Sequence, residues 1–349
     1  ARHGDALILH CSKGGNRGVI VIDGGPYANP RFNPFIREIE NCLPVDLMIL
    51  THFDDDHLIG IKTFVENHRD DVPFPIKKMW ANCAKHVSFD LSENLSSNKA
   101  SKMADILCTI SQKSQLDWEA YRLNGFVDDT ITFADIEVVN PRKDIFERFI
   151  ANYKEKYDCG SSEENLSNTK NMKSSINVDM HELAKRDKIL GNPDKPSELI
   201  NMVSLSVMIR CDVFSILALG DCFPKEIYLS LIERGYSKEN KLQVDFIKMS
   251  HHGSAENISN ELLDIIDCDN FIITTDGGKG YKHPHREALA NVLCHPERDY
   301  NRTVHFYFNY PLKTIVDNRE EDLFNSELDK CLNFECHEPK ETDRFLILP

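Results

Sequence analysis

The stretch Thr51-His52-Phe53-Asp54-Asp55-Asp56-His57 decides how this sequence is interpreted. It directly follows the apolar run 46–50, so it begins where a buried strand is expected to end. The stretch offers two imidazoles and, at alternating positions, the carboxylates of Asp54 and Asp56. Imidazole and carboxylate together suit zinc, manganese or iron. An acidic helix start would also explain Asp55 and Asp56, but it leaves both flanking histidines unexplained.

Working outward, three more apolar runs end on a polar residue of the same kind. Asp23 follows 18–22, Asp221 follows 213–219 after one glycine, and His251 follows 244–249 after one serine. A single Asp at a strand end is most often a turn residue or a helix cap. Ligands of open α/β sheets, however, gather at the carboxyl ends of strands. Counting the His/Asp stretch after 46–50, four predicted strands end close to an Asp or His, and this pattern favours a metal site.

The remaining periodicity predicts an α/β protein. Further strands are expected at 6–11, 77–81, 130–139, 203–211, 270–275 and 303–308, and helices at 33–43, after His57, and at 96–124, 224–236, 259–267 and 285–294. Residues 142–200 are polar and weakly periodic. They are interpreted as an insertion, partly helical, within one domain spanning 1–349. The insertion is a candidate lid or protein-partner surface, although a passive surface excursion explains it more simply.

Composition limits the classes of function. The chain has 349 residues, 41% hydrophobic and 28% charged, with no run long enough to suggest a membrane span. A formal net charge of -15 counts modestly against long duplex nucleic acids. The eleven cysteines include no C-x-x-C pair, and no secretory signal is recognisable, so a reducing, cytoplasmic location is expected.

At this point the sequence resembles a known family. His52-x-Asp54-x-Asp56-His57 is similar to the H-x-H-x-D-H motif of the metallo-β-lactamase superfamily, with Asp54 in place of the second histidine. That replacement occurs in the branch that includes the ComEC-type DNA-uptake proteins. Further segments resemble that branch in the same order, and they are Gly4-Asp5-Ala6, Ile22-Asp23-Gly24-Gly25, Asn201-x-x-Ser204-Leu205, Leu219-Gly220-Asp221, Ser250-His251-His252-Gly253-Ser254 and Tyr281-Lys282-His283-Pro284.

The resemblance implies a four-layer αββα sandwich with a two-metal site at one edge. His52 and Asp54 would hold one ion and Asp56 and His57 the other, while Asp221 would bridge them. His251 would complete the second site, with His252 as the alternative ligand. The remaining candidates have supporting or catalytic roles: Asp23 would support the cluster by hydrogen bonds, Asp56 and His283 are the candidate catalytic residues, and Ser254, Lys282 and His283 are candidate substrate contacts.

Two departures from the family pattern stand out. The superfamily usually supplies one more histidine between the cluster and the bridging aspartate. Here the only candidates are His68, His86 and His181, and none of them lies in a recognisable motif. The first metal site is therefore expected to be more open. Lys282 stands where the family more often has glycine, and a solvated lysine explains it more simply than a phosphate-binding one.

These observations predict a metal-dependent hydrolase, most specifically a phosphodiesterase or nuclease using a hydroxide activated by two metals. The expected ions are manganese or zinc, with magnesium also possible. One alternative is hydrolysis of a small molecule, such as a cyclic nucleotide, phosphocholine ester, lactone or thioester, since fold does not fix function. The other alternative is a non-catalytic module that binds a partner through 142–200.

Overall fold

A computed structural model describes residues 4–29, 34–83, 99–113, 116–119, 121–158, 176–186, 196–278, 282–340, 346 and 348. These residues form two compact units. The first unit contains the described residues up to 158 together with 196–213, and the second contains 176–186 and the described residues from 214 onward.

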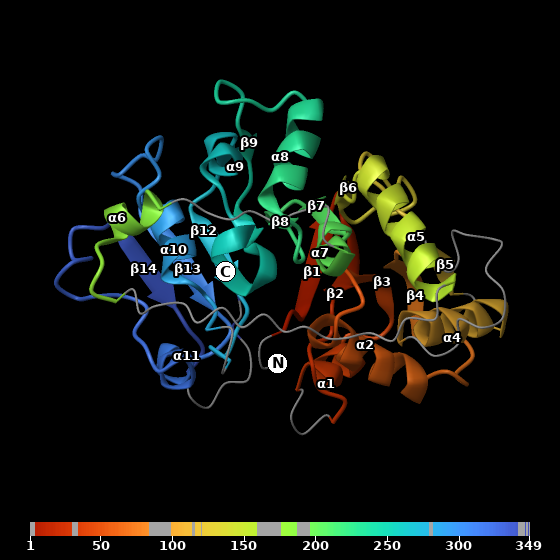
Figure 1. Ribbon diagram of the computed structural model, residues 1–349. Helices are drawn as coiled ribbons and strands as arrows, with labels where there is room; N and C mark the ends of the chain where they lie inside the picture. Colours follow the sequence, from red (N-terminus) through yellow and green to blue (C-terminus); the bar gives the residue numbers. More distant parts are fainter. Residues whose placement is uncertain are drawn as a thin grey trace. The chain divides into compact units, whose positions relative to one another are not determined.

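The first unit is built on a five-stranded sheet in the order β1-β2-β3-β4-β5 (Figure 1). Its strands are β1 (Leu7–Lys13), β2 (Asn16–Ile22), β3 (Val45–Leu50), β4 (Ile76–Ala81) and β5 (Asp117–Glu119). β1 and β2 are antiparallel, and the other neighbours are parallel. Gly14 and Gly15 form the two-residue turn between β1 and β2 with φ of 56° and 87°. Two positive φ angles are what a type I′ hairpin turn requires.

Three helices of the first unit cover one face of this sheet. They are α1 (Pro34–Asn41), α2 (Asp55–Asn67) and α4 (Lys99–Lys113). Their apolar faces share one buried cluster with alternate residues of β3 and β4, such as Met48, Leu50, Met79 and Ala81. The helices have apolar residues at helical spacing, and the strands have them at every second position, so the two apolar faces pack against each other. The packing fixes the carboxyl end of β3, where the sequence Thr51–His57 begins.

The rest of the first unit is an antiparallel pair of strands and two helices. β6 (Asp135–Asn140) pairs with β7 (Ser206–Arg210), and α5 (Lys143–Asp158) contacts α7 (Pro196–Met202). The Asn140 side-chain amide donates to the carbonyl oxygens of Met202 and Ser204, at 2.7 and 2.9 Å. The end of β6 therefore holds the backbone that leads into β7.

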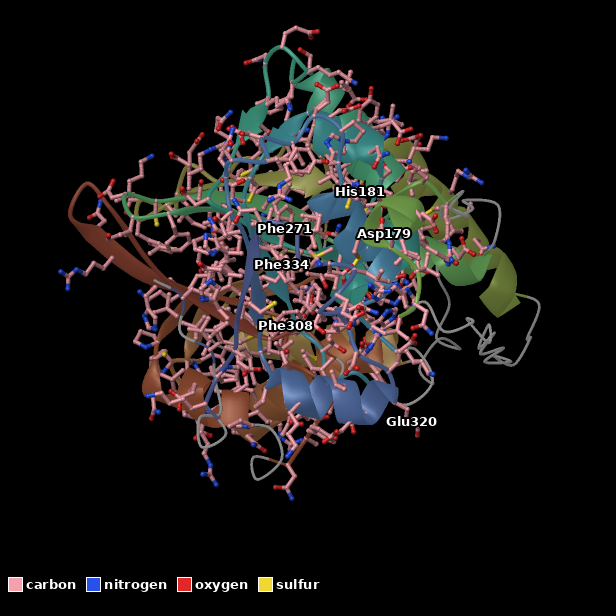
Figure 2. The ribbon with its side chains drawn as sticks, turned by 90° about the vertical axis from the view of Figure 1, so that its left-hand side faces the viewer. Asp179, His181, Phe271, Phe308, Glu320 and Phe334 are labelled. Atoms are coloured by element: carbon pink, nitrogen blue, oxygen red, sulfur yellow. The ribbon has the colours of Figure 1, made fainter. Side chains whose placement is uncertain are left out.

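The second unit is built on parallel strands in the order β8-β10-β12-β13-β14. They are β8 (Ser215–Ala218), β10 (Phe246–Lys248), β12 (Asn270–Ile273), β13 (Val304–Phe308) and β14 (Phe334–His337). Figure 2 labels Phe271, Phe308 and Phe334, one from each of the last three strands. A short parallel pair, β9 (Leu242–Gln243) and β11 (Ile266–Asp267), lies outside this sheet.

Helices and short turns complete the second unit. They are α6 (Met180–Ala184), α8 (Pro224–Glu233), the 3-10 turns η2 (Ser250–Gly253) and η3 (Ala255–Asn257), α9 (Asn260–Asp264), α10 (Arg286–Leu293) and α11 (Leu312–Arg319). α6 packs against α10, which is buried along its whole length. The described residues 176–186 of the sequence region 142–200 therefore belong to the second unit.

The α/β class predicted from the sequence is confirmed, because sheets of parallel strands alternate with helices in both units. Three element predictions need correction. The helix expected at 259–267 ends at Asp264, and Ile266–Asp267 form strand β11. The helix expected at 96–124 ends at Lys113 and is followed by strand β5. The strand expected at 130–139 begins only at Asp135. Asp128 accepts hydrogen bonds from the backbone N–H and hydroxyl of Thr130, and such local bonds favour a turn over a strand.

Within the described part of the chain, none of the helices combines the length and the apolar character that crossing a bilayer requires. Residues 159–175 and 187–195 of the predicted insertion lie outside the described residues, and the described parts of it include helices α5 and α6 and the start of α7.

Candidate functional site

In the first unit, Asp23 organises the stretch that follows β3. It lies at the end of β2, is fully buried, and accepts the Thr51 backbone N–H at 2.8 Å on one carboxylate oxygen. The other oxygen accepts the Thr51 hydroxyl and His57 Nδ1, both at 2.7 Å. Since a carboxylate only accepts, Nδ1 of His57 carries the hydrogen. The lone pair of neutral His57 is therefore on Nε2, the atom that a metal would take.

His52 is held in the same tautomer through Thr51. The Thr51 hydroxyl gives its only hydrogen to Asp23, so at 3.0 Å from His52 Nδ1 it acts as an acceptor. The Ser204 hydroxyl also lies 3.2 Å from the same nitrogen. Nε2 of neutral His52 therefore carries the lone pair and lies 3.7 Å from Asp54 Oδ2.

Asp54 and Asp56 sit where helix α2 begins. Asp54 is the N-cap residue, yet its side chain accepts no capping hydrogen bond, although N-cap carboxylates usually accept one from the first turn. Its carboxylate is 43% exposed and faces His52 instead. Asp56 Oδ2 lies 3.8 Å from His57 Nε2. The acidic helix start considered from the sequence is present, since Asp55 and Asp56 occupy the first turn, but it does not account for the position of Asp54.

The nitrogen–oxygen separations fit ligands of a metal better than direct hydrogen bonds. Two ligand atoms, each 2.0–2.2 Å from a tetrahedral ion, lie about 3.3–3.6 Å apart. The distances of 3.7 Å for His52–Asp54 and 3.8 Å for His57–Asp56 exceed this range only slightly. Asp5, Asp23 and His57 also present ligand atoms within 4.8 Å of one another. This group of the first unit, Asp23, His52, Asp54, Asp56 and His57, is called the first-unit cluster.

In the second unit, Asp221 and His251 repeat the arrangement. His251 Nε2 lies 3.7 Å from Asp221 Oδ2. His251 Nδ1 lies 3.2 Å from Asn257 Oδ1, an oxygen that can only accept, so Nδ1 carries the hydrogen here too. The amide nitrogen of Asn257 donates to the backbone carbonyls of Asp221 and Cys222, at 3.1 and 3.2 Å. Asn257 therefore ties the loop after β8 to the histidine that follows β10.

Two more histidines lie beside His251. His252 Nδ1 donates to the Thr274 carbonyl at 2.9 Å, which again places the lone pair of the neutral ring on Nε2. The His283 ring centroid lies 5.2 Å from that of His251 and 6.1 Å from that of His252. Burial, followed by the neighbouring His285, His251 and His252, lowers the pKa of His283 well below its ordinary value of 6.5. Asp221, His251, His252 and His283 are called the second-unit cluster.

Strained backbone coincides with both clusters. Within the described ranges, five non-glycine residues have positive φ, and four of them were singled out from the sequence: Asp23 (57°), His251 (47°), His252 (56°) and Lys282 (55°). Residues other than glycine rarely adopt this backbone conformation, and those that do concentrate at functional sites. The conformation of Lys282 also explains why glycine suits this position. Tyr281, before it, lies outside the described residues.

The other candidates have local contacts. The Ser254 hydroxyl caps η3 by accepting the Glu256 N–H at 3.4 Å. Of the possible additional histidines, His68 Nδ1 bonds to Asp71 at 2.7 Å, and His181 is exposed on α6 next to its capping residue Asp179 (Figure 2). His86 lies outside the described residues.

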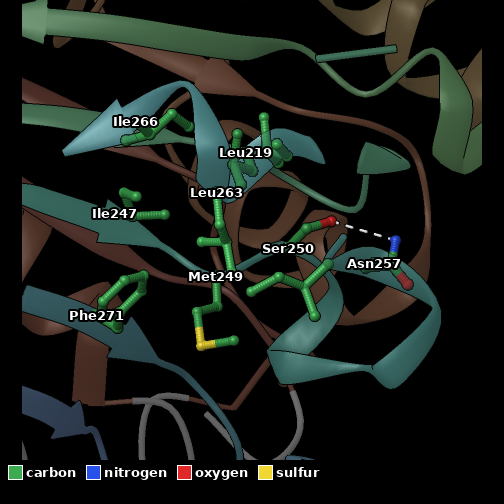
Figure 3. A pocket seen from close by; sticks show the side chains of 10 residues that line it. Leu219, Ile247, Met249, Ser250, Asn257, Leu263, Ile266 and Phe271 are labelled. Carbon is green, nitrogen blue, oxygen red and sulfur yellow. Dashed lines mark hydrogen bonds between the residues drawn. The ribbon is translucent and has the colours of Figure 1, made fainter. Parts of the chain in front are cut away.

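Residues that sequence reasoning did not assign a role complete the geometry. Thr51 and Ser204 hold His52 Nδ1, and both lay inside quoted motifs, so their position was the available signal. Asn257 had no such signal, because its role arises from contacts with two separate loops. Figure 3 shows its hydrogen bond to the Ser250 hydroxyl, 3.3 Å long, at the rim of a small pocket. That pocket is lined mainly by apolar side chains such as Leu219, Met249 and Phe271, and has the character of a packing defect rather than a substrate site.

Comparisons with known proteins add the following. No family model matches the chain, and no curated protein matches its sequence. Solved structures that match include the metallo-β-lactamase fold protein YhfI from Bacillus subtilis, at 8% identity and TM-score 0.36 over 96% of this chain and 95% of that one. Zn²⁺-bound PqqB from Methylobacterium extorquens matches at 10% identity and TM-score 0.40, over 95% and 97%.

A variant of the CmlA β-hydroxylase matches at 10% identity and TM-score 0.37, over 84% of this chain and 49% of that one. Likenesses this low assign neither family nor activity. The α/β class rests on the sheets and helices of the two units themselves. Groups of histidine and carboxylate side chains in these units could hold a metal ion.

Proposed function

We propose that this chain is a metal-dependent hydrolase, and most specifically a phosphodiesterase or nuclease. One observation carries the proposal. His52, His57, His251 and His252 each have Nδ1 engaged by an acceptor, so each neutral ring keeps its lone pair on Nε2. For the first three, that Nε2 lies 3.7–3.8 Å from an aspartate oxygen. Metal-binding histidines are oriented in this way: the ring nitrogen that does not bind the metal forms a hydrogen bond with a carboxylate, carbonyl or hydroxyl oxygen.

The proposed ligands are those expected from the sequence: His52, Asp54, Asp56, His57, Asp221 and His251, for two divalent ions. Asp54 in place of histidine makes the ligand set harder and more anionic, which shifts preference from zinc toward manganese or magnesium. Divalent ions supply a water of lowered pKa and offset charge on phosphate oxygens. Asp23 and Asn257 would orient ligand histidines, and His283 would contact the leaving group.

The choice of phosphodiesters rests on this anionic ligand set and on the resemblance of the motifs to the ComEC-type branch. Phosphoryl transfer places negative charge on non-bridging oxygens, which cations stabilise strongly. Nucleic acid is accordingly the first substrate class proposed. A role of 142–200 in binding a protein partner stays a prediction.

The test is cleavage of single- and double-stranded DNA and RNA, and of bis(p-nitrophenyl) phosphate, by metal-stripped protein reloaded with Mn²⁺. Wild type is compared with His57→Ala and with the control His68→Ala, which removes a histidine from the far end of the same helix. We expect cleavage by wild type and by the control, and its loss in His57→Ala. If metal-loaded wild type cleaves none of these substrates, the phosphodiesterase assignment is wrong.

A small-molecule substrate is the second candidate, and the net charge of -15 favours it. An acidic surface repels a polyanion more than a ligand with one or two charges. Cyclic nucleotides, phosphocholine esters, lactones and thioesters form the panel. Turnover of one of them by wild type but not by His57→Ala, without nucleic-acid cleavage, would select this alternative.

A further inference from the structure

A separate histidine–carboxylate group lies in the second unit, on strands β13 and β14. The two strands are parallel and in register, so His305 lies opposite Glu335 and Tyr307 opposite His337. On β13, Val304, Phe306 and Phe308 are buried, and the Phe306 ring contacts Phe334 of β14. Because side chains alternate along a strand, His305, Tyr307, Glu335 and His337 share the opposite face.

The side chains on this face converge. His305 Nδ1 lies 3.0 Å from His337 Nε2 and 3.5 Å from Glu335 Oε2. His337 Nε2 lies 3.9 Å from the same glutamate oxygen. The three side chains are 28%, 37% and 62% exposed for His305, His337 and Glu335, so an ion in solution can reach them. The His337 ring stacks on Tyr307 with centroids 4.5 Å apart and planes 14° apart, which restricts its rotation.

We propose that His305, Glu335 and His337 form a second metal site, independent of the hydrolase function, for a borderline divalent transition-metal ion. Two imidazoles and one carboxylate suit copper, nickel or zinc, whereas calcium and magnesium need more oxygen ligands. Two nitrogens at right angles, each 2.0–2.1 Å from an ion, lie about 2.8–3.0 Å apart. The 3.0 Å between the two imidazole nitrogens therefore matches the right-angle spacing of tetragonal Ni²⁺ or Cu²⁺. The Glu335 oxygen lies 3.5 and 3.9 Å from these nitrogens and would move closer on binding the ion.

Two simpler explanations make different predictions. Polar residues on an edge strand discourage pairing with other chains, and β14 is an edge strand of its sheet. That role requires exposed polar side chains, but it does not require these side chains to lie close together. A hydrogen bond between the two imidazoles alone explains the 3.0 Å distance but gives Glu335 no part. Glu335 also lies within ion-pair distance of both imidazoles, but only the metal site predicts a bound ion that is lost with either histidine.

The experiment is equilibrium dialysis of the full chain against Ni²⁺ at a free concentration set by a chelator, followed by elemental analysis of ions per chain. We expect His305→Gln and His337→Gln each to bind one Ni²⁺ fewer than wild type, and Glu335→Gln to bind that ion more weakly. His181→Gln is the matched control, because it removes an exposed histidine from the same unit and should leave the count unchanged. Circular dichroism confirms that each variant is folded.

A spectroscopic measurement separates this site from non-specific binding. Cu²⁺ bound in wild type should show electron paramagnetic resonance couplings to nitrogen that weaken in His305→Gln and His337→Gln. The proposal is overturned if these variants retain the full Ni²⁺ count, or if His181→Gln loses as much as they do. Absence of Mn²⁺-dependent cleavage by wild type would refute the proposed function but would leave the Ni²⁺ counts of these variants unaffected, so failure of the proposed function and failure of this site are distinguishable.

Discussion

Asp23→Asn is the most informative single substitution, because it changes one atom of a fully buried side chain. The oxygen that accepts from both the Thr51 hydroxyl and His57 Nδ1 would become an NH₂ group. Asparagine can still accept the Thr51 backbone N–H on its remaining oxygen. Its NH₂ group, however, can only donate, so Nδ1 of His57 must become the acceptor and the hydrogen moves to Nε2. His57 then presents an N–H where a metal needs a lone pair.

The expected cost is a 10–100-fold loss of Mn²⁺ affinity, which is the usual effect of removing the partner of a metal-binding histidine. It corresponds to about 1.4–2.8 kcal/mol. Isothermal titration with Mn²⁺ measures it, with thermal unfolding as the check on folding. Asp46→Asn is the control, since Asp46 on the neighbouring strand also accepts a backbone N–H, from Val19 at 2.8 Å. Unchanged affinity in folded Asp23→Asn, or an equal loss in Asp46→Asn, would refute the reasoning.

Three further predictions concern other parts of the two units. Asn257→Ala should lower the free energy of unfolding by about 1–3 kcal/mol, because buried carbonyls lose their donors. It should also weaken metal binding, because the ring of His251 loses the partner that holds it. Chemical denaturation and metal titration measure the two effects, and wild-type values in both would contradict the prediction. Gly24→Ala should destabilise the first unit by about 1–3 kcal/mol, because a Cβ there would lie 2.3 Å from the backbone nitrogen of Ile61; an unchanged denaturation midpoint would count against that packing. Burial lowers the pKa of His295 below its ordinary 6.5. As the pH falls below about 6.5, the unfolded chain therefore takes up a proton at this residue more readily than the folded chain does. The stability that neutral His295 contributes is present above about pH 6.5 and is lost as the pH falls from there. His295→Gln should therefore flatten the decline of unfolding free energy below pH 6.5, and identical pH profiles would exclude this role.

Much of the element order could be predicted, because most strands and helices have strong periodicity. The predicted helix 33–43 and strand 46–50 correspond to α1 and β3, since their apolar residues repeat at helical and buried-strand spacing. β14 could not be found, because it is only four residues long and places Glu335 and His337 on its outward face. Its stability comes from pairing with β13, which local sequence does not record.

The candidate residues could be named, but the order of their contacts could not. The sequence predicted that Asp23 lies near the cluster. It did not predict that the Thr51 hydroxyl bonds to both Asp23 and His52, because this depends on the backbone geometry after β3. Asn257 was missed for the same reason, since it bonds to residues that lie 35 and 36 positions earlier in the chain. Positive φ at His251 and His252 could not be predicted either, because histidine, although enriched there among non-glycine residues, adopts positive φ only in a minority of cases.

The most direct test of the central claim is the metal content of the purified chain after dialysis against Mn²⁺, measured for wild type, His57→Ala and His251→Ala. The proposed histidine and aspartate ligands predict bound Mn²⁺ in wild type and less in each variant, with all three proteins folded. Wild type that binds no Mn²⁺, or variants that bind as much as wild type, would contradict the assignment of these clusters as metal-binding sites.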